Sequence, residues 1–254
     1  MKIKTIINHL EKLCPGNLAI AKDPIGLQIG NLENNMQNIL IALDCSKKVI
    51  QKAVKNQCNL ILTHHPLFWP DKEKGIKESF YQKTKAKILN KQKITVYSLH
   101  TNYDEKYLKH QLLKKVASKS IVLSNLSGFI CAKLLQKQSL LSFIIKMKQI
   151  WKLPKIPGLI NNLNNQIETI AVVPGAGGFA IEQCIKKKID LIITGEIKWS
   201  DWIICRDYQQ NIITIGHHTE QLFIDHVTQL CQKTPDWEAT TKIIYHWEKA
   251  VEFH

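Results

Sequence analysis

The clearest structural signal in the chain is a short apolar stretch that ends in two histidines, Asn59-Leu60-Ile61-Leu62-Thr63-His64-His65. Its length and its content of β-branched residues and leucine are typical of a buried strand. An earlier run over 39–43 has the same character, and Ser46 can cap a helix between the two strands. Further along the chain, the pattern predicts a lysine-rich helix around 80–90, a strand at 94–98 and a helix over about 104–117. Strands that alternate with helices favour a mostly parallel α/β sheet.

The second half of the chain repeats this plan. A shift of 131 residues places 59–63 on 190–194 and 39–42 on 170–173, and a slightly different shift aligns 99–101 with 217–219. Three strand matches in the same order indicate an internal duplication. We therefore predict two related α/β units with mostly parallel sheets and a metal site between them. The first, over 1–120, carries the His-His and His-x-x-x-Asp motifs, and the second, over 121–254, carries the Gly-Glu and His-x-x-Glu motifs.

Side chains able to bind a metal follow the predicted strands. In open parallel sheets, ligands bind just beyond the carboxyl ends of the strands. Imidazole and carboxylate groups without thiolate suit Zn²⁺, Mn²⁺, Fe²⁺ or Ni²⁺. Adjacent histidines at a strand end point to opposite faces, which favours a pair of ions that each take one histidine. The strand-end residues are His64, His65, His100, Asp104, Glu196, His217, His218 and Glu220.

Each of these residues also has an ordinary structural interpretation. A single histidine at a strand end is usually capped or solvent-facing, Asp104 alone would be a helix N-cap, and Glu196 alone would be a surface carboxylate. The adjacency of His64 and His65, and the recurrence of histidine and glutamate at the equivalent place in the repeat, favour a metal site. The glycine-rich run 175–178 before a helix is either a phosphate-binding loop or a tight turn, and the absence of a Lys-Ser/Thr pair makes the turn at least as well supported.

Composition narrows the class of protein. The 254 residues, 44% hydrophobic and 22% charged, are ordinary for one large or two smaller globular domains. There is no apolar run of about 18 residues, and the start lacks a long apolar segment with a cleavage site. The seven cysteines are an odd number without a C-x-x-C pair, so we expect reduced core thiols in a cytoplasmic protein with no membrane segment.

The net charge of +14 raises nucleic acid as a partner. Arg206 is, however, the only arginine among the 35 basic residues. The bidentate guanidinium contacts that grip phosphates and guanines are therefore almost absent. Specific nucleic-acid binding is not favoured, and a solvated lysine-rich surface explains the charge.

Six motifs together resemble one family, the GTP cyclohydrolase type 2 homologue or NIF-three-like proteins. The match spans most of residues 20–225. The resemblance implies a duplicated α/β fold, a toroidal homohexamer and dinuclear metal sites that face an internal cavity. The motifs are Asp23-Pro24-Ile25-Gly26-Leu27-Gln28, Thr63-His64-His65-Pro66-Leu67, Leu99-His100-Thr101-Asn102-Tyr103-Asp104, Gly175-Ala176-Gly177-Gly178, Thr194-Gly195-Glu196 and Gly216-His217-His218-Thr219-Glu220.

The resemblance also implies two divalent ions (Zn, Mn, Fe or Ni) per chain, with Glu220 as the bridge between them. The implied ligands are His64, His65, Asp104, His217 and Glu220. The spacing from His217 to Glu220 is one residue shorter than is usual in the family, so His218 could be the ligand instead, although both spacings lie on one helical face.

Two functions from different classes are consistent with this site. The first is a metal-dependent hydrolase that acts on a nucleotide or a related phosphoester, with His100 or Glu196 steering protons. The alternative is a non-catalytic metal-binding scaffold or interaction protein that forms a ring. Turnover discriminates between them, because a scaffold would hold metal without hydrolysing any substrate.

Overall fold

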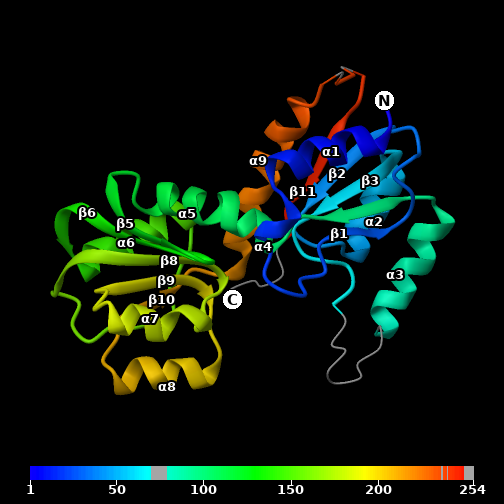
Figure 1. The fold of residues 1–254 in the computed structure, drawn as a ribbon. Coiled ribbons are helices and arrows are strands. Elements are labelled where there is room, and N and C mark those ends of the chain that lie inside the picture. The colour runs from blue at the N-terminus through cyan, green and yellow to red at the C-terminus, as the bar shows by residue number, and fades with distance from the viewer. Residues whose placement is uncertain (70–78, 236, 239, 249–254) are drawn as a thin grey trace. The chain divides into compact units, whose positions relative to one another are not determined.

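The computed structural model describes residues 1–69, 79–235, 237–238 and 240–248 (Figure 1). The chain divides into two compact units. Unit 1 contains Met1–Lys106 and Gln221–Glu248, and unit 2 contains Tyr107–Glu220. This division differs from the expected one at 1–120 and 121–254, because the C-terminal strand β11 (Ile243–His246) pairs in parallel with β2 (Asn38–Ala42) of unit 1.

Unit 1 is built on a five-stranded sheet in the order β1-β4-β3-β2-β11 (Figure 1). The strands β3 (Cys58–Thr63) and β4 (Thr95–Ser98) run parallel to β2 and β11, whereas β1 (Gly26–Ile29) is antiparallel to β4. The prediction of a mostly parallel sheet is therefore confirmed for this unit. The strands and helices predicted from the apolar runs in residues 39–98 lie within one or two residues of their expected ends.

The helices of unit 1 bury the apolar faces that the sequence pattern indicated. Helix α2 (Lys47–Lys55) begins at Ser46, whose hydroxyl accepts a hydrogen bond from the backbone of Val49, as predicted for an N-cap. It shares a core cluster with Leu40 and Ile61 of the sheet and with Leu89 of α3 (Phe80–Lys91). The remaining helical segments are α1 (Ile3–Leu13), η1 (Gly16–Leu18), α4 (Thr101–Tyr103), the π-helical turn η2 (Asp104–Leu108, of which Tyr107 and Leu108 fall in unit 2) and α9 (Leu222–Gln232).

Unit 2 has a six-stranded sheet in the order β5-β6-β8-β9-β10-β7. Only β8 (Gln166–Ala176), β9 (Leu191–Glu196) and β10 (Ile212–Thr214) are parallel to one another. The strands β5 (Ser120–Leu126), β6 (Phe129–Ser139) and β7 (Gly158–Leu159) are antiparallel to their neighbours. This sheet is mixed rather than mostly parallel, because a β5–β6 hairpin that reverses at Gly128, with φ of +79°, extends one side of it.

The helices of unit 2 are α5 (Lys109–Val116), α6 (Leu140–Trp151), η3 (Gly178–Ala180), α7 (Ile181–Lys186), α8 (Trp199–Asp207) and η4 (His217–Gln221, of which Gln221 falls in unit 1). The order β8-α7-β9-α8-β10 repeats the order β2-α2-β3-α3-β4 of unit 1, with parallel pairing in both. Two α/β units with a repeated three-strand plan are thus present, as the register shifts indicated.

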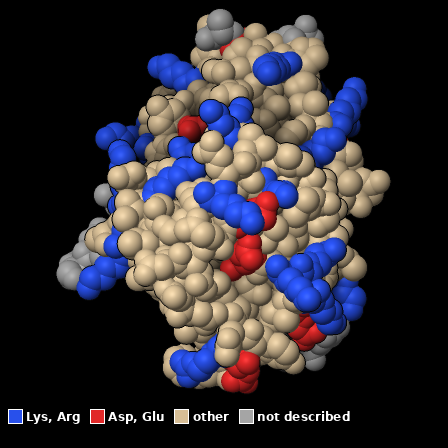
Figure 2. Space-filling view, turned by 90° about the vertical axis from the view of Figure 1, so that its left-hand side faces the viewer, with Lys and Arg blue, Asp and Glu red and all other residues tan. Residues whose placement is uncertain are grey.

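Three compositional expectations can be compared with the structure. All seven cysteines are free and buried, and burial raises the pKa of Cys14 and of Cys45 to about 12. On the face shown in Figure 2, the Lys and Arg side chains lie in several separate groups, with Asp and Glu near some of them. Among the described helices, none is both long and apolar enough to cross a bilayer.

Candidate metal centre

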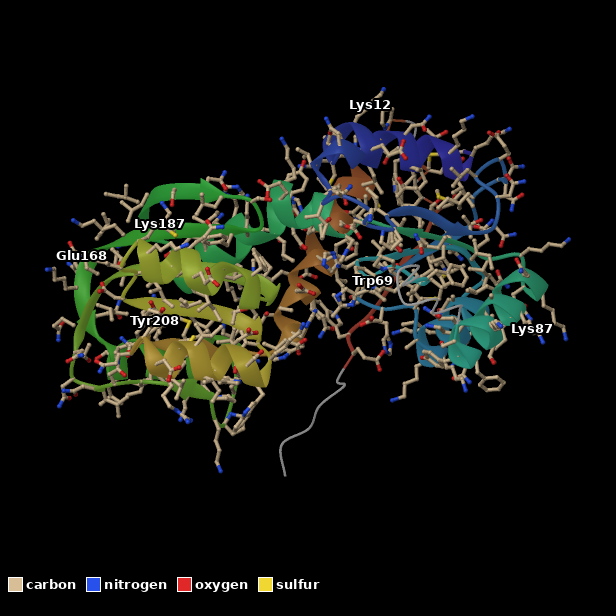
Figure 3. The ribbon with its side chains drawn as sticks, turned by 60° about the horizontal axis from the view of Figure 1, so that its bottom comes forward. Lys12, Trp69, Lys87, Glu168, Lys187 and Tyr208 are labelled. Carbon is tan, nitrogen blue, oxygen red and sulfur yellow. The ribbon has the colours of Figure 1, made fainter. Side chains whose placement is uncertain are left out.

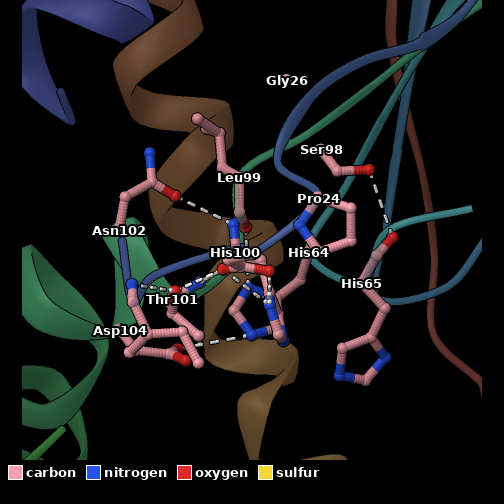
Figure 4. A network of polar contacts seen from close by, with 12 residues as sticks. Pro24, Gly26, His64, His65, Ser98, Leu99, His100, Thr101, Asn102 and Asp104 are labelled. Carbon is pink, nitrogen blue, oxygen red and sulfur yellow. Dashed lines mark hydrogen bonds and ion pairs between the residues drawn. The ribbon is translucent and has the colours of Figure 1, made fainter. Parts of the chain in front are cut away.

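Three histidines gather where two parallel strands of unit 1 end. His64 and His65 follow β3 directly, and His100 lies two residues beyond the end of β4. The last residues of these strands, Thr63 and Ser98, are paired. One donor nitrogen from each histidine lies within 4.8 Å of the other two (Figure 4). The centre of the His64 ring is 5.1 Å from that of His65 and 5.1 Å from that of His100.

Each of the three rings is held in the same way, through Nδ1. His64 Nδ1 lies 2.9 Å from the carbonyl oxygen of Leu99, and His65 Nδ1 lies 2.8 Å from Asp44 Oδ1. His100 Nδ1 lies 2.9 Å from Asp23 Oδ1. Carbonyl and carboxylate oxygens only accept, so Nδ1 donates in each case and Nε2 is the ring atom that can bind a metal. Metal-binding histidines almost always carry such a hydrogen bond on their second nitrogen.

Asp23 is the carboxylate that fixes His100. Its side chain is fully buried, and it also accepts hydrogen bonds from the backbone N–H and the hydroxyl of Thr101. Burial alone would raise the pKa of Asp23, but the hydrogen bonds from His100 and Thr101 outweigh it and leave the pKa below its ordinary value. Asp23 is therefore ionised at neutral pH. The sequence motif contained this residue, but its role was not predicted.

Gln28 ties the loop that carries Asp23 to the chain beyond His65. Its Nε2 donates to the carbonyl oxygens of Pro24 and Gly26, at 2.6 and 3.2 Å, and its Oε1 accepts from the backbone N–H of Phe68 at 3.2 Å. Gly26 has φ of +92°, a conformation that favours glycine. The loop and the two histidine-bearing segments are therefore held as one structure, part of which is visible in Figure 4.

Asp104 opens the π-helical turn η2, and its Oδ1 lies 3.3 Å from His64 Nε2. Its backbone is already helical, with φ of −56° and ψ of −48°, so it lies within a helical segment and is not an N-cap. Asn102 supports this turn, because its Oδ1 accepts from the backbone N–H of His100 at 3.0 Å and its Nδ2 donates to the carbonyl of Cys14. Single π-helical turns are frequent at functional sites.

The second group of expected residues lies at the strand ends of unit 2. His217 Nδ1 is 3.1 Å from Glu196 Oε1, and His217 Nε2 is 2.9 Å from Glu220 Oε2. Glu220 is buried, whereas Glu196 is exposed. Burial, followed by the charge of His217, lowers the pKa of His218, whose ring packs against Gly216. Within this unit His217, not His218, is the histidine that contacts both glutamates.

The glycine-rich run is closely packed against neighbouring side chains of unit 2. Gly175 has φ of +57°, and a Cβ on it would overlap Glu220 Oε1. Side chains at Gly177 and Gly178 would overlap Thr194 and Asp201. The helix that comes next, α7, has only six residues. The structure therefore shows the tight turn, which lets the backbone approach the buried carboxylate of Glu220.

Together these observations define a class: a protein of two related α/β units whose strand ends carry imidazole and carboxylate groups that could hold a metal ion. The chain belongs to the Duf34/NIF3 (NGG1p interacting factor 3) family, whose sequence model matches residues 1–248. The resemblance seen in the motifs is thereby confirmed.

Known relatives agree with this membership. A Clostridium perfringens protein named GTP cyclohydrolase 1 type 2 homolog is 33% identical over 233 residues, which are 87% of each chain. A Bacillus cereus protein related to NIF3 has a solved structure that superimposes with a TM-score of 0.83 at 18% identity, covering 100% of this chain and 99% of that one. Reduced HcgD from Methanocaldococcus jannaschii gives a TM-score of 0.79 at 26% identity, covering 96% and 97%.

Proposed function

We propose that this protein binds two divalent metal ions and hydrolyses a nucleotide or a related phosphoester. The proposed ligands are His64, His65, Asp104, His217 and Glu220, with Glu220 as the bridge between the ions. The observation that carries the proposal is the histidine cluster of unit 1, in which Nδ1 of every ring is occupied and the donor atoms converge within 4.8 Å. The names of the curated relatives support a nucleotide as the substrate class.

The chemistry of the donor set fits such ions. Neutral imidazole and carboxylate suit Zn²⁺, Mn²⁺, Fe²⁺ or Ni²⁺, and no thiolate is among the gathered donors of the described residues. A divalent ion bound there would supply Lewis-acid chemistry, polarising a phosphoryl or carbonyl group and lowering the pKa of water.

The residues around the ligands have two roles in this proposal. Asp44 orients His65, and the Leu99 carbonyl orients His64, so that both rings are set before anything binds. Asp23 keeps the proton on His100 Nδ1, which makes His100 Nε2 the atom that accepts a proton from a reacting group or returns it. Glu196 is the second candidate for moving protons, because it is exposed at the end of β9.

Two further properties belong to the proposal. We expect a toroidal homohexamer on the ground of the family resemblance, and a cytoplasmic location on the ground of the seven free, buried cysteines. Light scattering of the untagged protein checks the assembly, because a hexamer has six times the mass of the 29.2 kDa chain. Particles of one or two chains would contradict it.

The deciding experiment is elemental analysis of untagged protein beside the double variant His64→Ala, His65→Ala. We expect about two divalent ions per wild-type chain and far fewer in the variant, because two imidazole donors are lost. A His110→Ala variant is the matched control, since His110 is exposed on α5, and it should keep the full metal content. Chelation of the metal should lower the melting temperature of the wild type more than that of the double variant. Equal metal content in all three proteins would contradict the site.

A screen of nucleotides and phosphoesters then separates the hydrolase from the second candidate, a metal-holding interaction protein. The family description, which names an interacting factor, favours this alternative over other non-enzymatic roles. Turnover that is lost with the metal supports the hydrolase. Full metal content without turnover of any substrate supports the interaction protein.

A further inference from the structure

A groove on unit 1, away from the histidine cluster, runs between helices α2 and α3. Its volume is about 310 Å³, and its floor is apolar, formed by Ile50 and Val54 of α2 and Ile88 of α3. Val54 and Ile88 are 41% and 38% exposed. Lys47 Nζ of α2 lies 6.0 Å from the centre of the Tyr81 ring of α3. The α2/α3 groove, which is lined mostly by α2, therefore presents apolar surface to water.

The lining of the α2/α3 groove is positively charged, because its charged residues are Lys47 and Lys55 of α2. Helix α2 contains four lysines and α3 contains four, and neither helix contains an acidic residue. The whole chain, by contrast, has 35 basic and 21 acidic residues. Of the other lysines, Lys85 of α3 is buried and Lys52 of α2 donates to the carbonyl oxygen of Tyr245. Lys87 extends outward from α3 (Figure 3). The nearby carboxylate of Asp44 is hydrogen-bonded to His65.

We propose that the α2/α3 groove is a docking site for an acidic protein segment with apolar side chains. Carboxylates of such a segment would meet the lysines of the groove, and its apolar side chains would fill the floor, as an amphipathic helix does in a groove. This proposal does not depend on the metal site, because no histidine of the cluster lines the groove.

Nucleic acid and anionic lipid fit this surface less well. Neither helix contains arginine, the side chain that grips phosphate in a bidentate manner. A sugar–phosphate backbone offers nothing apolar to the floor of Ile50, Val54 and Ile88. A lipid surface is broad, whereas the apolar residues lie in a groove between lysines. An acidic peptide uses both the charge and the concave apolar floor.

The test uses the full-length protein and a dye-labelled helical peptide of about 18 residues, with Leu at positions i, i+3, i+4 and i+7 and Glu elsewhere. Fluorescence polarisation measures its binding to the wild type, to Lys47→Glu, Lys55→Glu and to Val54→Gln. A double variant with the same charge change, Lys12→Glu, Lys187→Glu, is the control, because both lysines lie elsewhere on the surface. Circular dichroism verifies that every variant is folded.

We expect binding by the wild type that weakens with added salt, and a loss of about tenfold in the groove double variant, because two attractive charges become repulsive. Val54→Gln should weaken binding severalfold, and the control should match the wild type within about twofold. Three results would overturn the proposal: equal loss in both double variants, equal binding of a peptide with Gln in place of Glu, or preferential binding of single-stranded DNA that the groove substitutions abolish.

Discussion

Units 1 and 2 share a strand plan and differ in the residues at the strand ends. The positions Ile61 and Ile192, related by the repeat, are both buried completely in the cores of their own units. The next residues diverge, because β3 leads into His64-His65 whereas β9 ends in Gly195-Glu196. Core positions keep their apolar character since packing demands it, while strand-end positions are free to acquire different chemistry.

The two units also support their strand-end residues by different means. In unit 1 the histidines are fixed by hydrogen bonds to Asp23, Asp44 and the Leu99 carbonyl. In unit 2 His217 contacts Glu196 and Glu220, and the strand ends that carry these residues are closely packed, since a Cβ on Gly195 would lie 2.6 Å from the Gly175 carbonyl oxygen. Hydrogen-bonded support should respond to pH and to removal of a carboxylate, whereas close packing should respond to added atoms. Of the three measurements that follow, the first tests the core plan that the units share, and the other two test this difference in support.

The largest effect is expected from Ile61→Ala and Ile192→Ala, which test whether the repeated core positions are equivalent. Each substitution deletes buried methyl and methylene groups from a fully buried site and should cost about 2–5 kcal/mol of unfolding free energy. Urea unfolding monitored by circular dichroism measures both. A loss of less than about 1 kcal/mol of unfolding free energy at either position would show that the two positions do not contribute equally to the cores of their units.

An intermediate effect is expected from Gly175→Ala in unit 2. The left-handed φ of +57° and the overlap of the new Cβ with Glu220 Oε1 should together cost about 1–3 kcal/mol of unfolding free energy. Gly16→Ala is the control, because a Cβ there makes an ordinary contact of 3.5 Å with Ile25. Thermal unfolding compares the two variants. Equal stability would mean that the glycine turn does not hold Glu220 by close packing.

The smallest effect, and the one that depends on pH, is expected from Asp23→Asn in unit 1. The folded-state pKa of Asp23 lies below its ordinary value of 3.8, so its carboxylate stabilises the fold at pH values above 3.8. That contribution is lost as the pH falls below 3.8 through the folded-state pKa. The stability difference between wild type and variant should therefore be present at neutral pH and shrink in this acidic window.

Glu196→Gln gives the comparison for unit 2. Glu196 is exposed at the surface, 3.1 Å from His217, and exposed ion pairs contribute little to stability. Chemical unfolding of both variants should show a loss of stability for Asp23→Asn that shrinks in the acidic range, and only a small loss of stability at neutral pH for Glu196→Gln. If the unfolding stability of the two variants changed with pH in the same way, the proposed difference between the two units in how strand-end residues are supported would be contradicted.

The sequence predicts those parts of the fold that depend on local pattern. The apolar runs indicated β2, β3 and β4, and the cap at Ser46 is a property of its own side chain. The placement of β11 beside β2 depends on a pairing across more than two hundred residues and has no local signal. The β5–β6 hairpin turns at Ser127-Gly128, a common turn pair, but no strand was predicted on either side of that dipeptide.

For the candidate site too, the sequence predicted only part of the residues. Histidines and carboxylates that follow a predicted strand can be recognised from the sequence alone, so it indicated His64, His65, His100 and Asp104. The carboxylates that orient them, Asp23 and Asp44, are distant in sequence from the rings they hold, by 77 residues in the case of His100. Such long-range hydrogen bonds depend on how loops fold over a sheet, which periodicity does not encode.

The burial of all seven native thiols has a practical consequence for labelling. Reagents such as maleimides reach a buried thiol only when the surrounding structure opens. A cysteine introduced on the surface, for example Lys12→Cys on α1, should therefore react far faster than the native ones. Dyes, spin labels and cross-linkers can then be attached at chosen points without first replacing the native cysteines. The slow reaction rate of the native cysteines would in turn measure how often the structure around them opens.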